Sequence, residues 1–192
     1  MGLHKVAALV EYEGTLFSGY QLQVGVRTVQ GELEAAVQKL SGAVSRVQAA
    51  SRTDTGVHAA GQVVSVWVRE DMEPSTLVGG MNYYLPSDVA VRGACVIDGD
   101  FDVRRRAVVR EYRYCIVTGT TRGPLEERFA LRVRERLDAN LMRAAARLIQ
   151  GVHDLGSFAT ALEEGESTVR LVHEARILEE RGRLEVVLAA NA

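Results

Sequence analysis

The sequence predicts an α+β fold with a mostly antiparallel sheet. Strand-like and helix-like segments alternate along the 192 residues, and several strand-like segments follow one another as hairpin neighbours do. Hydrophobic residues make up 47% and charged residues 25% of the chain, which is typical of a globular protein with a real core. A boundary near residue 107 separates two halves with a broadly similar order of elements. We therefore expect two α/β domains, residues 1–107 and 108–192.

The first half reads as strands joined by two helical segments. Apolar residues alternate in the way of half-buried strands over residues 4–12, 45–50, 62–68 and 89–97. Thr28 can cap a helix whose inward stripe consists of Val29, Leu33, Ala36, Val37 and Leu40. Residues 75–84 predict a second helix, weakened by two internal glycines.

The second half begins with a strand over residues 110–118. Asp138 is expected to cap a helix that ends before Gly151, with an inward face of Leu141, Ala145, Leu148 and Ile149. Residues 170–179 and 184–190 predict two strands, joined by a hairpin turn at residues 180–183.

Composition argues against several classes of protein. No apolar run approaches the ~20 residues that span a bilayer, and no charged-then-apolar leader opens the chain, so we expect a cytoplasmic protein without membrane contact. Cys95 and Cys115 lie in strand-like runs without metal-ligand spacing, which indicates buried free thiols. The four histidines show no ligand pattern, so no metal is expected.

Charge is distributed unevenly along the chain. The net charge is −2, but the window from Phe101 to Arg136 holds ten arginines and five acids, and so carries +5. Such asymmetry is typical of a surface that follows phosphates, although a solvated arginine-rich face gives the same pattern. Arg104, Arg105, Arg106 and Arg110 are the candidates for phosphate contacts.

The stretch at residues 51–59, Ser-Arg-Thr-Asp-Thr-Gly-Val-His-Ala, lies between two strand-like runs. Loops held by rigid strands are frequent sites of chemistry, and here a carboxylate, Asp54, follows a guanidinium, Arg52, by two residues. By spacing alone, a strand connection with a surface ion pair explains the same pattern. His58 has close apolar neighbours in sequence, which favours a hydrogen-bonded structural histidine over a general base.

The motif Arg-Thr-Asp-Thr-Gly-Val-His-Ala resembles the signature of the tRNA pseudouridine synthase A family. Ser51 stands where the family has glycine, Glu13 where it has aspartate, and Tyr20 where it has tryptophan. The resemblance covers nearly the whole chain through further matches, namely residues 12–15, 19–23 and 28–33, Asn82 with Leu85-Pro86, Phe101 with Arg104, Tyr112-Arg113-Tyr114, and Asp154 with Ser157-Phe158.

This resemblance implies two related α/β halves with a merged sheet and an active-site cleft between them. It also implies conversion of uridine to pseudouridine in the anticodon stem-loop of tRNA, without a cofactor, by a homodimer. Asp54 would be the catalytic carboxylate, and Arg52 would fill the gap left by the flipped base or hold a phosphate. Tyr112 would stack on the flipped uracil, although a core aromatic is the plain alternative for a strand tyrosine.

The family further implies a helix beyond Asn191-Ala192, with an arginine that pairs with the catalytic aspartate. We therefore expect this chain to lack one side chain of the family's site. Two alternatives stay open. One is a non-catalytic RNA-binding fragment, and the other is a sugar-cleaving hydrolase that uses Glu13 as a second carboxylate.

Overall fold

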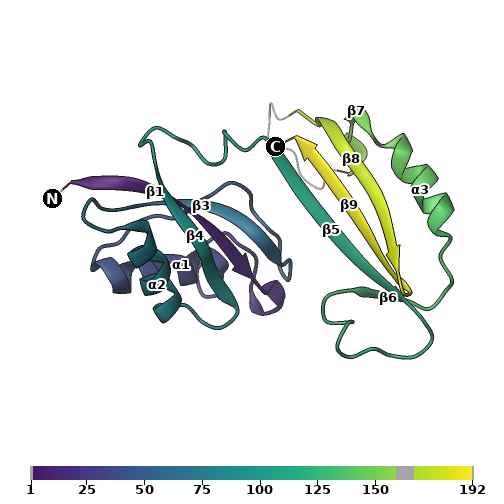
Figure 1. The fold of residues 1–192 in the computed structure, drawn as a ribbon, viewed down its shortest axis with the longest axis horizontal. Helices are drawn as coiled ribbons and strands as arrows, with labels where there is room; N and C mark the ends of the chain where they lie inside the picture. Colours follow the sequence, from purple (N-terminus) through teal and green to yellow (C-terminus); the bar gives the residue numbers. More distant parts are fainter. Residues whose placement is uncertain (1, 159–166, 192) are drawn as a thin grey trace. The chain divides into compact units, whose positions relative to one another are not determined.

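The computed structural model describes residues 2–158 and 167–191, which form two compact units, Met1–Ala107 and Val108–Ala192 (Figure 1). Each unit contains its own sheet and at least one helix, which confirms the α+β class. The merging of the two sheets and the cleft between the halves stay predictions.

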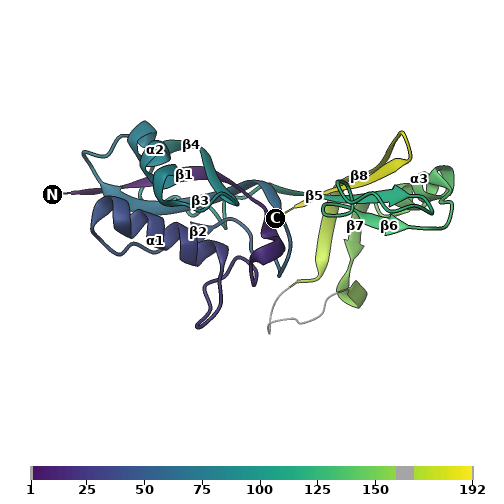
Figure 2. The ribbon, with the colours of Figure 1, turned by 90° about the horizontal axis from the view of Figure 1, so that it is seen from below.

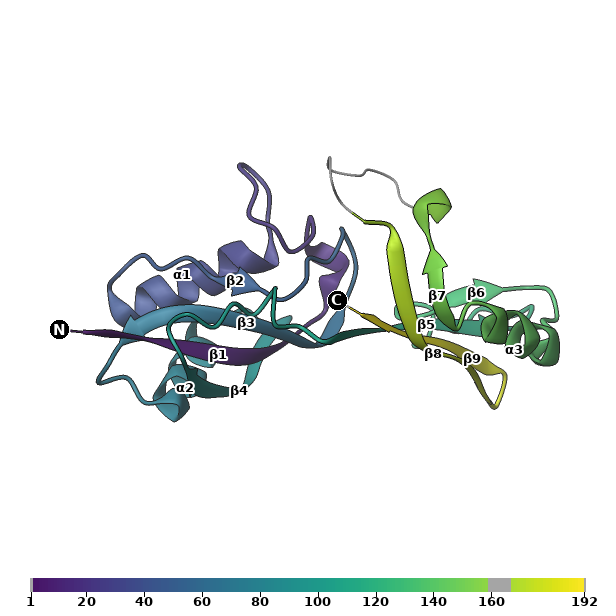
Figure 3. The same ribbon diagram turned by 90° about the horizontal axis from the view of Figure 1, so that it is seen from above.

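The first unit is a four-stranded antiparallel sheet with the order β2-β3-β1-β4. Helices α1 and α2 lie next to each other in Figure 1, and Figure 3 shows α2 beside β4. The elements are β1 (Leu3–Tyr12), the 3-10 turn η1 (Gly14–Leu16), α1 (Val29–Ser41), β2 (Gln48–Ala49), β3 (Ala59–Arg69), α2 (Pro74–Tyr84) and β4 (Val89–Ile97).

The core of the first unit follows the predicted periodicities. Alternate side chains of β1 and β3 are buried with the inner faces of both helices, and the cluster includes Val6, Val10, Val64, Val66, Val68, Leu33, Val37, Leu77 and Met81. Thr28 caps α1 by accepting a hydrogen bond from the backbone N–H of Gly31. The α1 stripe is confirmed, with Leu40 partly buried at its end.

The predicted strand at residues 45–50 is shorter than expected. The ladder with β3 is limited to Gln48 and Ala49, with the Ala50 N–H donating to the carbonyl of Val63 at 2.9 Å, although Val47 is buried. The Ser45 hydroxyl donates to the carbonyl of Trp67 at 2.9 Å, so a side chain occupies an acceptor on β3 that a strand N–H would use.

The second unit is a five-stranded sheet with the order β6-β5-β9-β8-β7. All of its pairings are antiparallel except β5–β6, which is parallel. The elements are β5 (Val109–Thr118), β6 (Leu131–Val133), α3 (Ala139–Leu148), β7 (Gly151–Asp154), the 3-10 turn η2 (Gly156–Phe158), β8 (Val169–Glu180) and β9 (Arg183–Asn191). Arg181 and Gly182, both with positive φ, form the predicted tight turn of the β8–β9 hairpin, drawn in yellow in Figure 2.

The predicted inward face of α3 is wrong. Asp138 caps the helix as expected, accepting from the N–H groups of Asn140 and Leu141. However, Leu141, Ala145, Leu148 and Ile149 are all exposed, and Ala139 and Ala146 are buried instead. The small alanines let α3 lie close to β8, where Arg143 donates to the carbonyl of Ile177 at 3.3 Å and pairs with Glu179 at 3.1 Å.

Both cysteines are free, as predicted, but neither is buried. Cys95 follows a register shift in the β1–β4 ladder at Leu9/Val10. Its neighbour Ala94 packs against the core, so Cys95 lies on the opposite face of the sheet and is exposed.

Candidate functional site

The motif loop at residues 51–58 is held by Tyr12, the last residue of β1, and by the segment that follows it. The Tyr12 hydroxyl and Thr53 Oγ1 are hydrogen-bonded at 2.8 Å, and the Tyr20 N–H donates to the carbonyl of Thr53 at 2.9 Å. The Gly56 N–H donates to the carbonyl of Phe17 at 3.3 Å. The residues on both sides of Asp54 are therefore fixed by backbone and hydroxyl contacts with residues 12–20.

Two glycines make this close approach possible. A Cβ at Gly14 would lie 2.0 Å from the carbonyl oxygen of Val57, and one at Gly19 would lie 3.0 Å from that of Thr53. Gly19 also has a φ of +85°, which side chains disfavour. The glycines of the segment after β1 are thus required by the packing of the two loops.

His58 links the same two loops. Its Nδ1 accepts a hydrogen bond from the Gly14 N–H at 3.0 Å, and Glu13 Oε1 lies 3.4 Å from the same nitrogen. An Nδ1 that accepts a backbone N–H places the ring proton of a neutral histidine on Nε2. This geometry confirms that His58 is hydrogen-bonded, and its structural role stays a prediction.

Asp54 and Arg52 are both exposed on the motif loop. The Asp54 carbonyl accepts from the Val57 N–H at 3.1 Å, which closes the turn that contains Gly56. Within residues 2–158 and 167–191, no ion pair joins the two side chains, so the surface ion pair of the plain alternative is not seen. Exposed pairs stabilise a protein by only about 0–1 kcal/mol, so little holds these two side chains together.

Arg104, Arg105 and Arg106 follow the buried Val103 and expose their side chains. Asp102 Oδ1 accepts from the N–H groups of Arg105 at 3.0 Å and Arg104 at 2.8 Å, and these bonds lower the pKa of the Asp102 carboxyl. Asp102 therefore fixes a turn that exposes three guanidinium groups, of which that of Arg105 lies 3.8 Å from the Asp102 carboxylate.

Arg110 and Tyr112 belong to β5 in the second unit. Tyr112 and Tyr114 share one face of the sheet and are 51% and 56% exposed, so the alternative of a core aromatic is wrong for both. The physical reason is the position of α3, which packs against β8, two strands away from β5. Arg110 is half-buried on the same face.

Several arginines of the +5 window are engaged within the second unit. Arg113 forms an ion pair with Glu111 at 2.9 Å. Glu127 forms ion pairs with Arg132 at 2.9 Å and with Arg122 at 3.4 Å. These pairs reduce the charge that the part of the window in the second unit offers to a partner.

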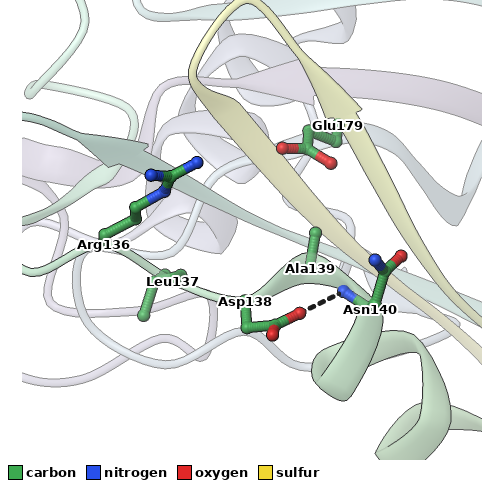
Figure 4. Close-up of a pocket in the computed structure, with 6 residues that line it drawn as sticks. All are labelled: Arg136, Leu137, Asp138, Ala139, Asn140 and Glu179. Carbon is green, nitrogen blue, oxygen red and sulfur yellow. Dashed lines mark hydrogen bonds between the residues drawn. The ribbon is translucent and has the colours of Figure 1, made fainter.

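A pocket of about 440 Å³ lies at the start of α3, and no sequence pattern predicted it (Figure 4). It is lined by Arg136, Leu137, Asp138, Ala139, Asn140 and Glu179. The Asp138 carboxylate caps the helix and Glu179 pairs with Arg143, so its two acidic groups already have structural partners. Nowhere in the described part of the chain do three His, Cys, Asp or Glu residues gather as a metal site.

Comparison with known proteins defines the class of protein. The family model described as "tRNA pseudouridine synthase" matches residues 8–104, which include the motif loop and the segment that holds it. The chain belongs to the tRNA pseudouridine synthase family.

The relatives point to one type within that family. A tRNA pseudouridine synthase A of Roseiflexus sp. is 45% identical, over 91% of this chain and 64% of the relative. Those of Chloroflexus aurantiacus and Shewanella woodyi are 38% and 39% identical, over 99% and 98% of this chain and 70% and 72% of the relatives. The chain thus spans 64% to 72% of the length of these relatives. Across its described residues, no helix is both long and apolar enough to cross a membrane.

Proposed function

We propose that this protein converts uridine to pseudouridine in the anticodon stem-loop of tRNA. The observation that carries the proposal is the placement of Asp54, which is exposed at the centre of a loop whose neighbouring residues are fixed by the segment after β1. Family membership supports the reaction class, and each of these fixing contacts lies inside the matched residues 8–104.

The reaction breaks the N1–C1′ glycosidic bond, turns the base and rejoins it through C5. It is an isomerisation without net oxidation or phosphate transfer, and so requires no cofactor. Breaking this bond requires a carboxylate that stabilises or captures an electron-poor sugar carbon, or that removes a proton from the sugar. Asp54 carries this role in the proposal.

The remaining site residues handle the RNA. The target uridine is extruded from its stack at a cost of a few kcal/mol, and stacking on Tyr112 offsets about 1–3 kcal/mol of this. Arg52 contacts a phosphate or fills the vacated space, and Arg104, Arg105 and Arg106 track the backbone together with Arg110. We further propose a homodimer that works in the cytoplasm, where tRNA is its partner.

Asp54→Asn tests the catalytic role, since it keeps the shape of the side chain and removes its charge. We expect loss of tritium release from C5-labelled uridine in tRNA, with tRNA affinity within a few fold of the parent. Asp98→Asn is a matched control, because Asp98 is exposed and follows the far end of β4, away from the motif loop. Substantial turnover by Asp54→Asn would exclude Asp54 as the essential carboxylate.

Salt dependence of tRNA binding tests the arginine contacts. Each neutralised phosphate contributes about −0.7 to −0.9 to the slope of log affinity against log salt. Arg106→Gln is expected to make the slope shallower by about one such unit, because its side chain is exposed and, among the described residues, forms no ion pair, whereas Arg105 lies 3.8 Å from Asp102. A slope near zero for the parent would mean that the arginines are only solvated surface.

A further inference from the structure

The loop between η1 and α1 exposes an apolar tip. Residues 21–27 protrude from the first unit (Figure 3), with Val24 fully exposed and Leu22 and Val26 exposed by 41% and 47%. Gly25, with a φ of +80°, forms the turn at the tip. Single exposed aliphatic side chains are common on proteins, but here Leu22, Val24 and Val26 are all exposed at alternate positions around one turn.

The base of this loop is braced on both sides. The Ser18 N–H donates to the carbonyl of Arg27 at 2.9 Å, and the Leu22 N–H donates to Gln30 Oε1 at 3.0 Å. Arg27 makes two hydrogen bonds of 2.7 and 2.8 Å to the Asp88 carboxylate, and its guanidinium lies 4.1 Å from the centre of the Phe17 ring. The tip therefore projects from a base that is fixed to α1 and to the start of β4.

The same base contacts the motif loop directly. Tyr20, the residue before the protruding loop, donates its N–H to Thr53, the residue before Asp54. Gly19 lies so close to the motif loop that an added Cβ would be 3.5 Å from the carbonyl carbon of Asp54. The apolar tip is thus connected to the proposed catalytic carboxylate through one short, hydrogen-bonded path inside a single unit.

We propose that Val24, supported by Leu22 and Val26, is an apolar wedge that enters the RNA stack beside the target uridine. This inference rests on the proposed function, since it concerns how the uridine reaches Asp54. Proteins that unstack nucleic acids insert aliphatic or aromatic side chains between bases, and the wedge gains the burial of apolar surface that water otherwise covers. A braced loop suits this role, because a flexible tip would fold back instead of separating two bases.

Base extrusion can be measured without turnover. In the Asp54→Asn background, an anticodon stem-loop RNA with 2-aminopurine beside the target uridine reports unstacking as a rise in fluorescence. We expect Val24→Ser to slow this rise about tenfold, which corresponds to about 1.4 kcal/mol in the barrier. Val24→Leu, which keeps an aliphatic tip, is expected to retain the parent rate. RNA binding, followed by anisotropy, is expected to stay within a few fold for both variants.

Val44→Ser is the matched control. Val44 is 80% exposed in the same unit but follows the C-terminal end of α1, while the wedge precedes its N-terminal end. An unchanged rate for Val24→Ser, or an equal loss for Val44→Ser, would overturn the inference. So would the absence of any fluorescence rise with the Asp54→Asn protein. Failure of the proposed function is a separate outcome, namely absence of pseudouridine from the reaction of the parent chain with tRNA.

Discussion

Removing the hydroxyl of Tyr12 is expected to disturb the motif loop more than the fold. Tyr12 is 3% exposed, and its hydroxyl meets Thr53 Oγ1 at 2.8 Å. A neutral hydrogen bond of this kind contributes about 0.5–1.5 kcal/mol net. Since Thr53 is half-buried, its hydroxyl can turn to water in Tyr12→Phe, and we expect a loss of about 1 kcal/mol. In a domain of this size that lowers the melting temperature by about 4 °C.

Thr53→Val is expected to destabilise the protein more than Tyr12→Phe. In this variant the buried Tyr12 hydroxyl keeps, among the described residues, only Gln62 as a side-chain hydrogen-bond partner. Part of the free-energy cost of burying that hydroxyl is then no longer compensated. The double variant Tyr12→Phe/Thr53→Val removes both partners, so its loss should be smaller than the sum of the two single losses, by about 1 kcal/mol.

Turnover should fall further than stability, because Thr53 precedes Asp54 and a shift of about 1 Å at a reacting group reduces rates by up to about a hundredfold. We expect kcat for pseudouridine formation to fall about tenfold or more in either single variant, with KM little changed. Tyr83→Phe, which removes the hydroxyl of an 82% exposed tyrosine, is the control. Additive losses in the double variant, or an unchanged kcat in both single variants, would refute the reasoning.

Three further predictions concern the residues around the motif loop. Tyr20→Phe should raise stability to urea by about 1 kcal/mol, because the buried Tyr20 hydroxyl has no hydrogen-bond partner among the described residues. His58→Ala should lower the stability to urea by about 1–3 kcal/mol, because the Gly14 N–H loses its hydrogen-bond acceptor. Hydrogen bonds from Arg27 hold the pKa of the Asp88 carboxyl below its usual 3.8, so its ionised form stabilises the protein above that pH. This contribution is lost as the pH falls through the lowered pKa, and Asp88→Asn should weaken the acid dependence of stability measured by thermal unfolding.

Each of these predictions has a contrary result. A loss of stability in Tyr20→Phe would mean that its hydroxyl is satisfied, and unchanged stability in His58→Ala would mean that water replaces the imidazole at Gly14. Equal acid dependence in Asp88→Asn and the parent would show that other carboxyl groups account for the acid transition.

Sequence periodicity predicted the fold well where one face of an element is strongly apolar. The α1 stripe and the alternation in β3 left one possible inner face each. Helix α3 had two possible inner faces, because Leu141 and Leu148 match a helical period and Ala139 and Ala146 match it equally well. The choice between them depends on tertiary contacts of Arg143 with β8, which no local pattern shows. Strand β6 has three residues, too few for a two-residue period to be visible.

The candidate site was predictable as a motif but not as an arrangement. The loop and its carboxylate were evident from residues 51–59, while the contacts that hold them join residues 41 positions apart, in the Tyr12–Thr53 pair, and 44 apart, in the Gly14–His58 pair. The glycines after β1 gave the only local signal of this packing. The tip at Val24 gave none, because an aliphatic residue in a loop has no periodic pattern to fit.

The way Asp54 is held has a consequence for the proposed reaction. An exposed ion pair with Arg52 would contribute about 0–1 kcal/mol, too little to fix a carboxylate, whereas the bonds to Thr53 and Gly56 fix the backbone and leave the carboxylate in water. Bound RNA would exclude that water and lower the effective dielectric constant. At 4 Å, the attraction between unit charges then rises from about 1 kcal/mol in water to about 4 kcal/mol. The attraction of Asp54 for a cationic sugar carbon would therefore appear only once substrate covers the loop, and Arg52, without a resting partner among the described residues, would remain available for the RNA.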